Sequence, residues 1–122
     1  MPIIRVLVVD DYEPWRRFVC SLLQKRADLE IVGEVADGLE AVQRAGELHP
    51  DLILLDIGLP SLNGIEAARR LRMISPNSKI LFVSQESSAD VVQEALSVGA
   101  CSYVLKSNAS DLLTSMDAVL VA

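Results

Sequence analysis

Three aspartates follow apolar segments and could together perform chemistry. Asp10 and Asp11 come directly after residues 3–9, and Asp56 ends the run "LILLD". If the fold brings these carboxylates together, they repel one another unless some are protonated or share a cation. Mg²⁺ suits such a cluster, because it binds one or two carboxylates together with waters and phosphate oxygens. The three aspartates therefore predict a magnesium site that is open to a phosphoryl group.

Two further polar residues, Ser84 and Lys106, end later apolar runs and fit phosphoryl transfer. Asp56 is ionised at neutral pH and needs no general base to attack phosphorus. The Lys106 ammonium can neutralise the charge on the equatorial oxygens, and the Ser84 hydroxyl can donate a hydrogen bond to the new phosphoryl group. Each residue alone is more often a solvated strand end or a helix cap, so the prediction depends on their joint pattern.

Apolar runs alternate with helical patterns along the whole chain. We predict strands over residues 3–9, 29–36, 52–56, 79–84 and 101–106. We predict helices around Trp15–Leu23 and over residues 37–48, 63–74, 89–99 and 110–121. This alternation predicts one doubly wound α/β domain over residues 1–122, a three-layer α/β/α sandwich with a parallel sheet. In the flavodoxin-like strand order 2-1-3-4-5, Asp11 and Asp56 lie at the ends of neighbouring strands.

The composition and charge of the chain argue against several classes of function. A net charge of −6 argues against direct nucleic-acid binding by this domain, and the arginines of residues 69–72 are interpreted as a solvated helix face. Cys20 and Cys101 are interpreted as small buried thiols, and His49 as a surface loop residue. The chain has no apolar run long enough for a membrane span and no signal peptide at its start, so we expect a cytoplasmic protein without membrane contact.

The motifs "VLVVDD", "PDLILLDIGLPSLNG", "ILFVS" and "YVLK" resemble those of the receiver domain of two-component response regulators. The resemblance covers essentially the whole chain. It implies that Asp56 is the phosphoacceptor, charged from a phosphohistidine on a sensor histidine kinase, and that Lys106 pairs with the phosphoryl group. It also implies that Ser84 and Tyr103 form a switch pair, and that the protein is a signalling switch rather than an enzyme.

The same resemblance implies a ligand set for Mg²⁺. Asp11 and Asp56 would bind the ion directly, the Gly58 backbone carbonyl would be the third protein ligand, and Asp10 would act through a water molecule. Phosphorylation adds nearly two negative charges and would favour one of two pre-existing loop arrangements.

Three residues depart from the family pattern. Ser107 stands where the family usually has a proline in a cis bond, so the peptide after Lys106 is expected to be trans or repositioned. Gly58 lacks the larger side chain that is common at its position, and Gln85 replaces a small residue. We interpret these differences as tuning the phosphoryl lifetime or the switch.

Within the family, residues 30–72 look most like the subclass with a C-terminal LuxR-type helix-turn-helix. The resemblance therefore favours the receiver part of a DNA-binding transcriptional regulator, in which DNA is contacted only by an effector domain outside this chain. A stand-alone receiver or phosphorelay protein is the alternative. The face formed by the fourth helix, fifth strand and fifth helix is the candidate surface for homodimerisation.

Two other classes remain open. A flavodoxin-like flavin module would share the fold, but its phosphate needs a loop rich in free backbone amides, which "DDYEP" does not offer. A Mg²⁺-dependent aspartyl-phosphate phosphatase usually has its nucleophile and acid two residues apart, whereas Asp10 and Asp11 are adjacent. Flavin absorbance or multiple-turnover phosphatase activity would identify these alternatives.

Overall fold

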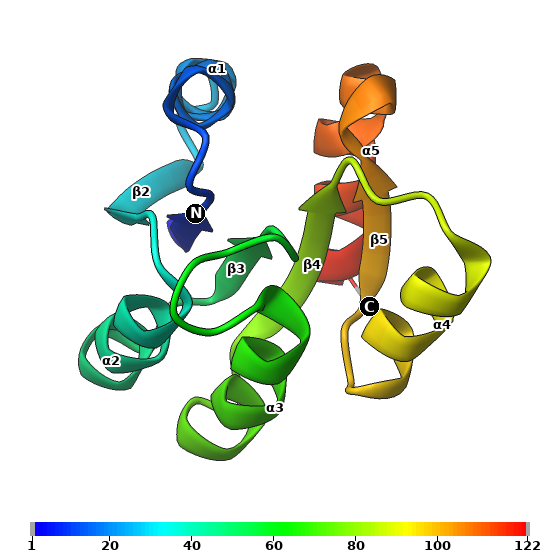
Figure 1. Ribbon diagram of the computed structural model, residues 1–122. Coiled ribbons are helices and arrows are strands. Elements are labelled where there is room, and N and C mark those ends of the chain that lie inside the picture. Colours follow the sequence, from blue (N-terminus) through cyan, green and yellow to red (C-terminus); the bar gives the residue numbers. More distant parts are fainter. Residues whose placement is uncertain (1, 122) are drawn as a thin grey trace.

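A five-stranded parallel sheet forms the centre of the computed structural model, which describes residues 2–121 (Figure 1). The strand order is β2-β1-β3-β4-β5, as the sequence predicts. The strands are β1 (Ile4–Val9), β2 (Leu29–Val35), β3 (Leu52–Leu55), β4 (Lys79–Ser84) and β5 (Ser102–Leu105). The helices are α1 (Glu13–Gln24), α2 (Gly38–Leu48), α3 (Gly64–Ile74), α4 (Ala89–Ser97), the 3-10 helix η1 (Lys106–Asp111) and α5 (Leu112–Val121).

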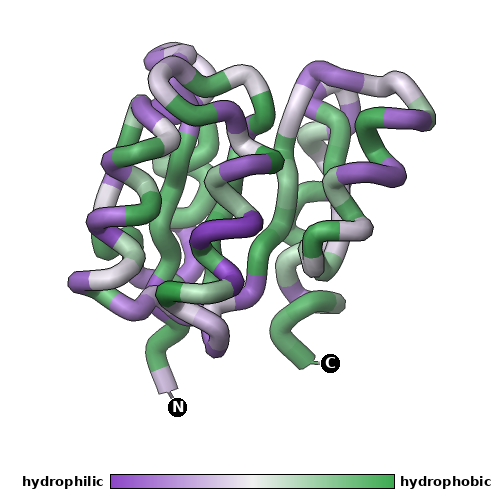
Figure 2. The backbone as a smooth tube through the Cα atoms, turned by 60° about the horizontal axis from the view of Figure 1, so that its bottom comes forward, coloured by the Kyte–Doolittle hydropathy of each residue, from purple (hydrophilic) through white to green (hydrophobic). Residues whose placement is uncertain are grey.

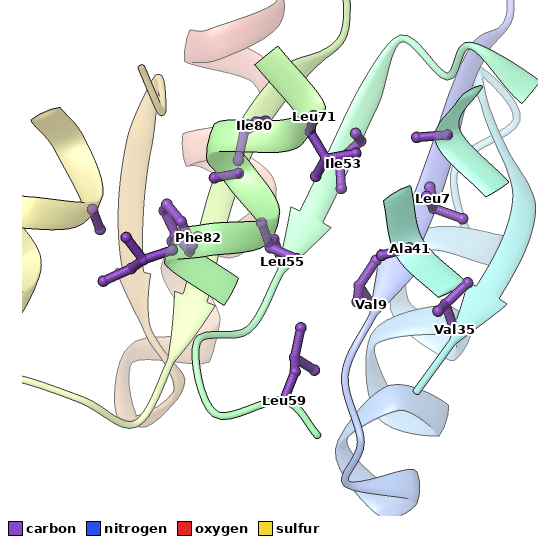
Figure 3. Packing of buried hydrophobic residues seen from close by; sticks show 14 residues of the cluster. Leu7, Val9, Val35, Ala41, Ile53, Leu55, Leu59, Leu71, Ile80 and Phe82 are labelled. Carbon is purple, nitrogen blue, oxygen red and sulfur yellow. The ribbon is translucent and has the colours of Figure 1, made fainter. Parts of the chain in front are cut away.

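The helices cover both faces of the sheet, which confirms the three-layer prediction. Helices α2, α3 and α4 lie on one face, while α1 and α5 lie on the other (Figure 1). In a strand, successive side chains point to opposite faces, so each central strand supplies both cores. Leu7 and Val9 of β1 point toward α2 and α3 (Figure 3), whereas Val6 and Val8 pack with α1 and α5. Hydrophobic residues occupy much of the interior in Figure 2, and the apolar character of the central strands β1, β3 and β4 is explained by burial on both sides.

Polar residues start two of the helices on the sheet face that carries α2 and α3. The Asp37 carboxylate accepts hydrogen bonds from the backbone amides of Leu39 and Glu40, and the Asn63 side chain accepts one from Glu66. These side chains satisfy amides that have no partner within the helix. The predicted helix starts at residues 37 and 63 are therefore confirmed to within one residue.

Two expectations about the end of the chain are wrong in detail. The fifth strand stops at Leu105, and Lys106 begins η1, so α5 starts at Leu112 and not at Ser110. Cys101 is exposed, whereas Cys20 is buried as predicted. Cys101 precedes β5, an edge strand whose start is not covered by a further strand, so the apolar pattern there does not produce burial.

The predictions for His49 and for the arginines of residues 69–72 are confirmed. His49 is exposed and ends α2 in the left-handed conformation, with φ of 46°. The arginines at positions 69, 70 and 72 are exposed on α3. No helix within residues 2–121 combines the length and the apolar character needed to cross a membrane.

Candidate functional site

The three predicted aspartates meet at the carboxyl edge of the sheet. The Asp10 amide donates to the Val35 carbonyl at 2.9 Å, and the Asp56 amide donates to the Val9 carbonyl at 3.1 Å. These bonds extend the parallel ladder one residue beyond each strand and so fix where both aspartates lie. One carboxylate oxygen from each of Asp10, Asp11 and Asp56 lies within 4.8 Å of the other two. The arrangement that the strand order predicts is therefore present.

The three carboxylates have different surroundings. Asp10 is buried. Its carboxylate accepts a hydrogen bond from the Tyr12 amide at 2.9 Å and forms an ion pair with Lys106 at 2.8 Å. Burial nevertheless raises the pKa of Asp10, because the loss of hydration outweighs the lowering effect of Lys106. Asp56 is also buried and accepts a hydrogen bond from the Ile57 amide at 2.8 Å, whereas Asp11 is exposed.

Lys106 brings the positive charge to this cluster. Its ammonium lies 2.8 Å from Asp10 and 3.4 Å from Asp56, and its side chain is only 8% exposed. No peptide bond among residues 2–121 is cis, so the bond before Ser107 is trans. The lysine still reaches both acids, because the chain turns into η1 directly after β5.

A cavity of about 450 Å³ opens beside the acids. Its walls are formed by Asp11, Tyr12, Asp56, Ile57, Gly58, Ser84, Gln85, Glu86 and Lys106. A side-chain carbon at Gly58 would meet no atom within 4 Å, so this wall of the cavity is open. The cavity therefore leaves room for a phosphoryl group and its donor next to Asp56.

Of the two predicted switch residues, Ser84 lines the same cavity, whereas Tyr103 reaches it only through its contact with Glu86. Ser84 is buried at the end of β4, and its hydroxyl accepts a hydrogen bond from the Glu86 amide at 3.2 Å. The Tyr103 hydroxyl donates to the Glu86 carbonyl at 2.7 Å. Burial raises the pKa of Tyr103, and a hydrogen bond with Ser84 partly offsets this effect. Both side chains thus contact the backbone of one loop residue, Glu86.

The loop that follows Asp56 is held by close backbone contacts. A side-chain carbon at Gly64 would lie 1.9 Å from the Asp56 carbonyl oxygen, so only glycine fits there. The Gly64 amide donates to the Ile57 carbonyl at 2.7 Å. Ser61 adopts the left-handed conformation, with φ of 67°, and its hydroxyl donates to Asp37. Gly64 and the turn at Ser61 therefore fix the backbone of the loop "IGLPSLNG", beside the phosphoacceptor candidate Asp56.

Sequence reasoning missed two residues on α1. Arg16 donates to the Asp10 carbonyl at 2.7 Å, and the Trp15 ring lies 5.5 Å from the Lys106 ammonium. The sequence pattern predicts only that Trp15 belongs to a helix. A signal was present in the sequence, because the first turn of a helix that follows Asp11 so closely must pass near the acids.

The residues fit Mg²⁺ by their chemistry. All three candidate side-chain ligands are carboxylates, which are the hard oxygen donors that this ion prefers. Three carboxylates beside a single ammonium leave two formal negative charges, which a divalent cation would neutralise. Gly58, whose backbone carbonyl is the third ligand that the resemblance implies, lines the same cavity.

Comparisons with known proteins agree with this geometry. The response regulator receiver domain family matches residues 6–117. The response regulator protein VraR of Staphylococcus aureus is 39% identical over 107 residues, which is 88% of this chain and 51% of that protein. The chain thus spans about half the length of this curated relative.

Solved structures give the same result. A LuxR-family two-component response regulator from Aurantimonas sp. SI85-9A1 superposes with a TM-score of 0.92 and 31% identity, covering 98% of this chain and 86% of that one. The response regulator domain of Thermotoga maritima CheB gives 0.89 and 34%, covering 98% and 96%. The chain belongs to the receiver domain family of two-component response regulators, with relatives in the LuxR family.

Proposed function

We propose that this domain is a phosphorylation-dependent switch in which Asp56 accepts a phosphoryl group from a sensor histidine kinase with Mg²⁺ bound. The observation that carries the proposal is the meeting of Asp10, Asp11 and Asp56 within 4.8 Å, beside Lys106 and an open cavity. Membership of the receiver family supports the class of phosphodonor.

Asp56 is suited to be the nucleophile. Its carboxylate lines the cavity, and the Ile57 amide and Lys106 hold it in place. In the proposed step, a carboxylate oxygen of Asp56 forms a bond to phosphorus while the bond from phosphorus to the donor's imidazole nitrogen breaks, and the nitrogen keeps the electron pair. Bound Mg²⁺ would supply charge neutralisation at the phosphoryl oxygens, with Asp11, Asp56 and the Gly58 carbonyl as ligands and Asp10 acting through water.

Lys106 has a separate role in this step. Its ammonium lies between Asp10 and Asp56, so a small movement would bring it to an oxygen of the transferred group. A preorganised cation at the position where charge accumulates lowers the barrier without reorganising solvent. The lysine also prevents the two buried carboxylates from facing each other unneutralised.

The output of the switch is proposed to run through Ser84 and Tyr103. A phosphoryl group on Asp56 offers acceptor oxygens to which the Ser84 hydroxyl can donate while its oxygen still accepts from the Glu86 amide, so a movement of Ser84 toward the phosphoryl group would carry the Glu86 loop with it. Tyr103 is bound to the same residue, so a shift of the Glu86 loop would free its hydroxyl. The phosphoryl group would thereby favour a second arrangement of the loop before α4.

We further propose that residues 1–122 form a single regulatory domain of a DNA-binding transcriptional regulator in the cytoplasm. The LuxR-family relatives support this assignment, and the chain covers about half of VraR, which leaves room for an effector domain in such proteins. Phosphoryl transfer would be limited to self-phosphorylation and autodephosphorylation. Any homodimer would use the face formed by α4, β5 and α5.

The test is intact-mass spectrometry after incubation with acetyl phosphate, with and without Mg²⁺. We expect wild type to gain one phosphoryl group only with Mg²⁺, and Asp56→Asn to gain none. Asp51→Asn is the matched control, because Asp51 flanks the opposite end of the same strand, and it should gain the group normally. A mass gain that persists in Asp56→Asn would refute the assignment.

A further inference from the structure

The Trp15 indole lies next to the catalytic candidate Lys106. The Lys106 ammonium is 5.5 Å from the centre of the Trp15 ring, within the range of a cation–π interaction. Trp15 lies in the first turn of α1, and its body packs against the core between the sheet and α1 and α5. The indole is therefore held in place by its packing against the core, and its ring faces the lysine.

Other contacts leave the position of Lys106 weakly determined. Its ammonium has two carboxylate partners at unequal distances, 2.8 Å to Asp10 and 3.4 Å to Asp56. A lysine side chain is a point charge on a flexible stem, so carboxylates alone fix its position poorly. The following backbone is irregular as well, because Asn108 within η1 has non-helical dihedral angles.

The charge on the two carboxylates changes during the proposed reaction, whereas the charge distribution of the indole ring stays the same. When Asp56 is phosphorylated or its charge is neutralised by a cation, the balance that places the ammonium between the two acids is altered. An aromatic face attracts the ammonium in every one of these states, because the attraction comes from the fixed quadrupole of the ring.

We propose that Trp15 is a positioning residue for Lys106, which holds the ammonium between Asp10 and Asp56, within a small movement of the phosphoryl group. The inference rests on the proposed function for its role in transfer. The contact between the indole and the lysine can be tested independently of any reaction.

The first experiment compares rates of phosphoryl uptake from acetyl phosphate with Mg²⁺ by intact mass. We expect Trp15→Leu to be about three- to tenfold slower than wild type, because it removes the aromatic face, and Trp15→Phe to keep most of the rate. Phe18→Leu is the matched control. It removes the ring that lies 5.2 Å from Trp15 on the same helix, and it should leave the rate unchanged.

A double-mutant cycle separates positioning from general damage to the fold. If Trp15 acts through Lys106, Trp15→Leu has little further effect on the rate once Lys106 is alanine. An equal loss in both backgrounds would overturn the inference, as would a Trp15→Leu rate equal to wild type. Failure of wild type to gain any phosphoryl group would instead overturn the proposed function.

The second experiment uses no phosphodonor. The chain contains one tryptophan, so its fluorescence reports on Trp15 alone. We expect Lys106→Ala to change the emission intensity in Mg²⁺-free buffer, and Arg70→Ala, at an exposed site on α3, to leave it unchanged. Identical emission from wild type and Lys106→Ala would show that the indole and the ammonium do not interact, and would overturn the inference whatever the phosphorylation result.

Discussion

An aspartate flanks each end of strand β3, and the two aspartates have different surroundings. Asp51, before the strand, accepts a hydrogen bond from the Arg5 amide at 2.8 Å, and the Arg5 guanidinium donates to the Leu48 carbonyl at 2.7 Å. At the same edge, Ser78 donates to the Pro50 carbonyl and bonds to Ser75. Asp56, after the strand, instead shares one lysine with a second buried carboxylate, beside an exposed third.

This difference in surroundings indicates that the amino edge of the sheet has a structural role and the carboxyl edge a functional one. At the amino edge, the polar groups named above are satisfied by other groups of the protein, as buried polar groups usually are. At the carboxyl edge, the three carboxylates exceed the positive charge of Lys106, so the site favours a bound cation. We therefore expect the stability effects of substitutions at the carboxyl edge to depend on Mg²⁺, and those at the amino edge not to.

Lys106→Ala is expected to give the largest effect. It leaves Asp10 and Asp56 buried without a cation, which should lower the free energy of unfolding by about 3 kcal/mol in Mg²⁺-free buffer. Adding Mg²⁺ should restore part of this loss, because the ion takes over the neutralisation. Urea unfolding with EDTA and with Mg²⁺ measures both values, and an unchanged loss in Mg²⁺ would contradict the electrostatic account of this edge.

Ser78→Ala tests the opposite edge. Its hydroxyl is buried and bonds to Pro50 and Ser75, so its removal should cost about 1–2 kcal/mol. The same urea experiment should give an equal loss with and without Mg²⁺. A loss that Mg²⁺ reverses would show that the two edges are not energetically distinct.

Asp10→Asn should give the smallest effect, and one that depends on pH. Burial raises the pKa of Asp10 above the unfolded value of 3.8, so the folded state binds this proton more tightly than the unfolded chain. Its contribution to stability is present below the unfolded pKa and is lost as pH rises through the folded pKa. In EDTA, the stability of Asp10→Asn relative to wild type should therefore increase as pH rises from about 4 to 7.

Thermal unfolding across this pH range, with Mg²⁺ as the comparison, checks the prediction. Mg²⁺ should reduce the advantage of Asp10→Asn at neutral pH, because the ion stabilises the ionised cluster of the wild type. A pH-independent difference between the two proteins would contradict it.

The sheet and the meeting of the acids could be predicted from the sequence because both follow from strand periodicity. Once β1 and β3 are neighbours, Asp10, Asp11 and Asp56 must lie at one edge. Side-chain contacts between elements far apart in the sequence could not be predicted in this way. The position of Trp15 over Lys106 depends on how α1 packs against the sheet, and the exposure of Cys101 depends on its place just before an edge strand.

The most direct test of the account is isothermal titration of Mg²⁺ into wild type, Asp11→Asn and Asp51→Asn at neutral pH. We expect one binding site in wild type and in Asp51→Asn. The affinity should be at least about tenfold weaker in Asp11→Asn, because that substitution removes one of the three clustered carboxylates. No binding to wild type, or equal affinity in wild type and Asp11→Asn, would contradict the claim that the crowded acids at this edge form a magnesium site.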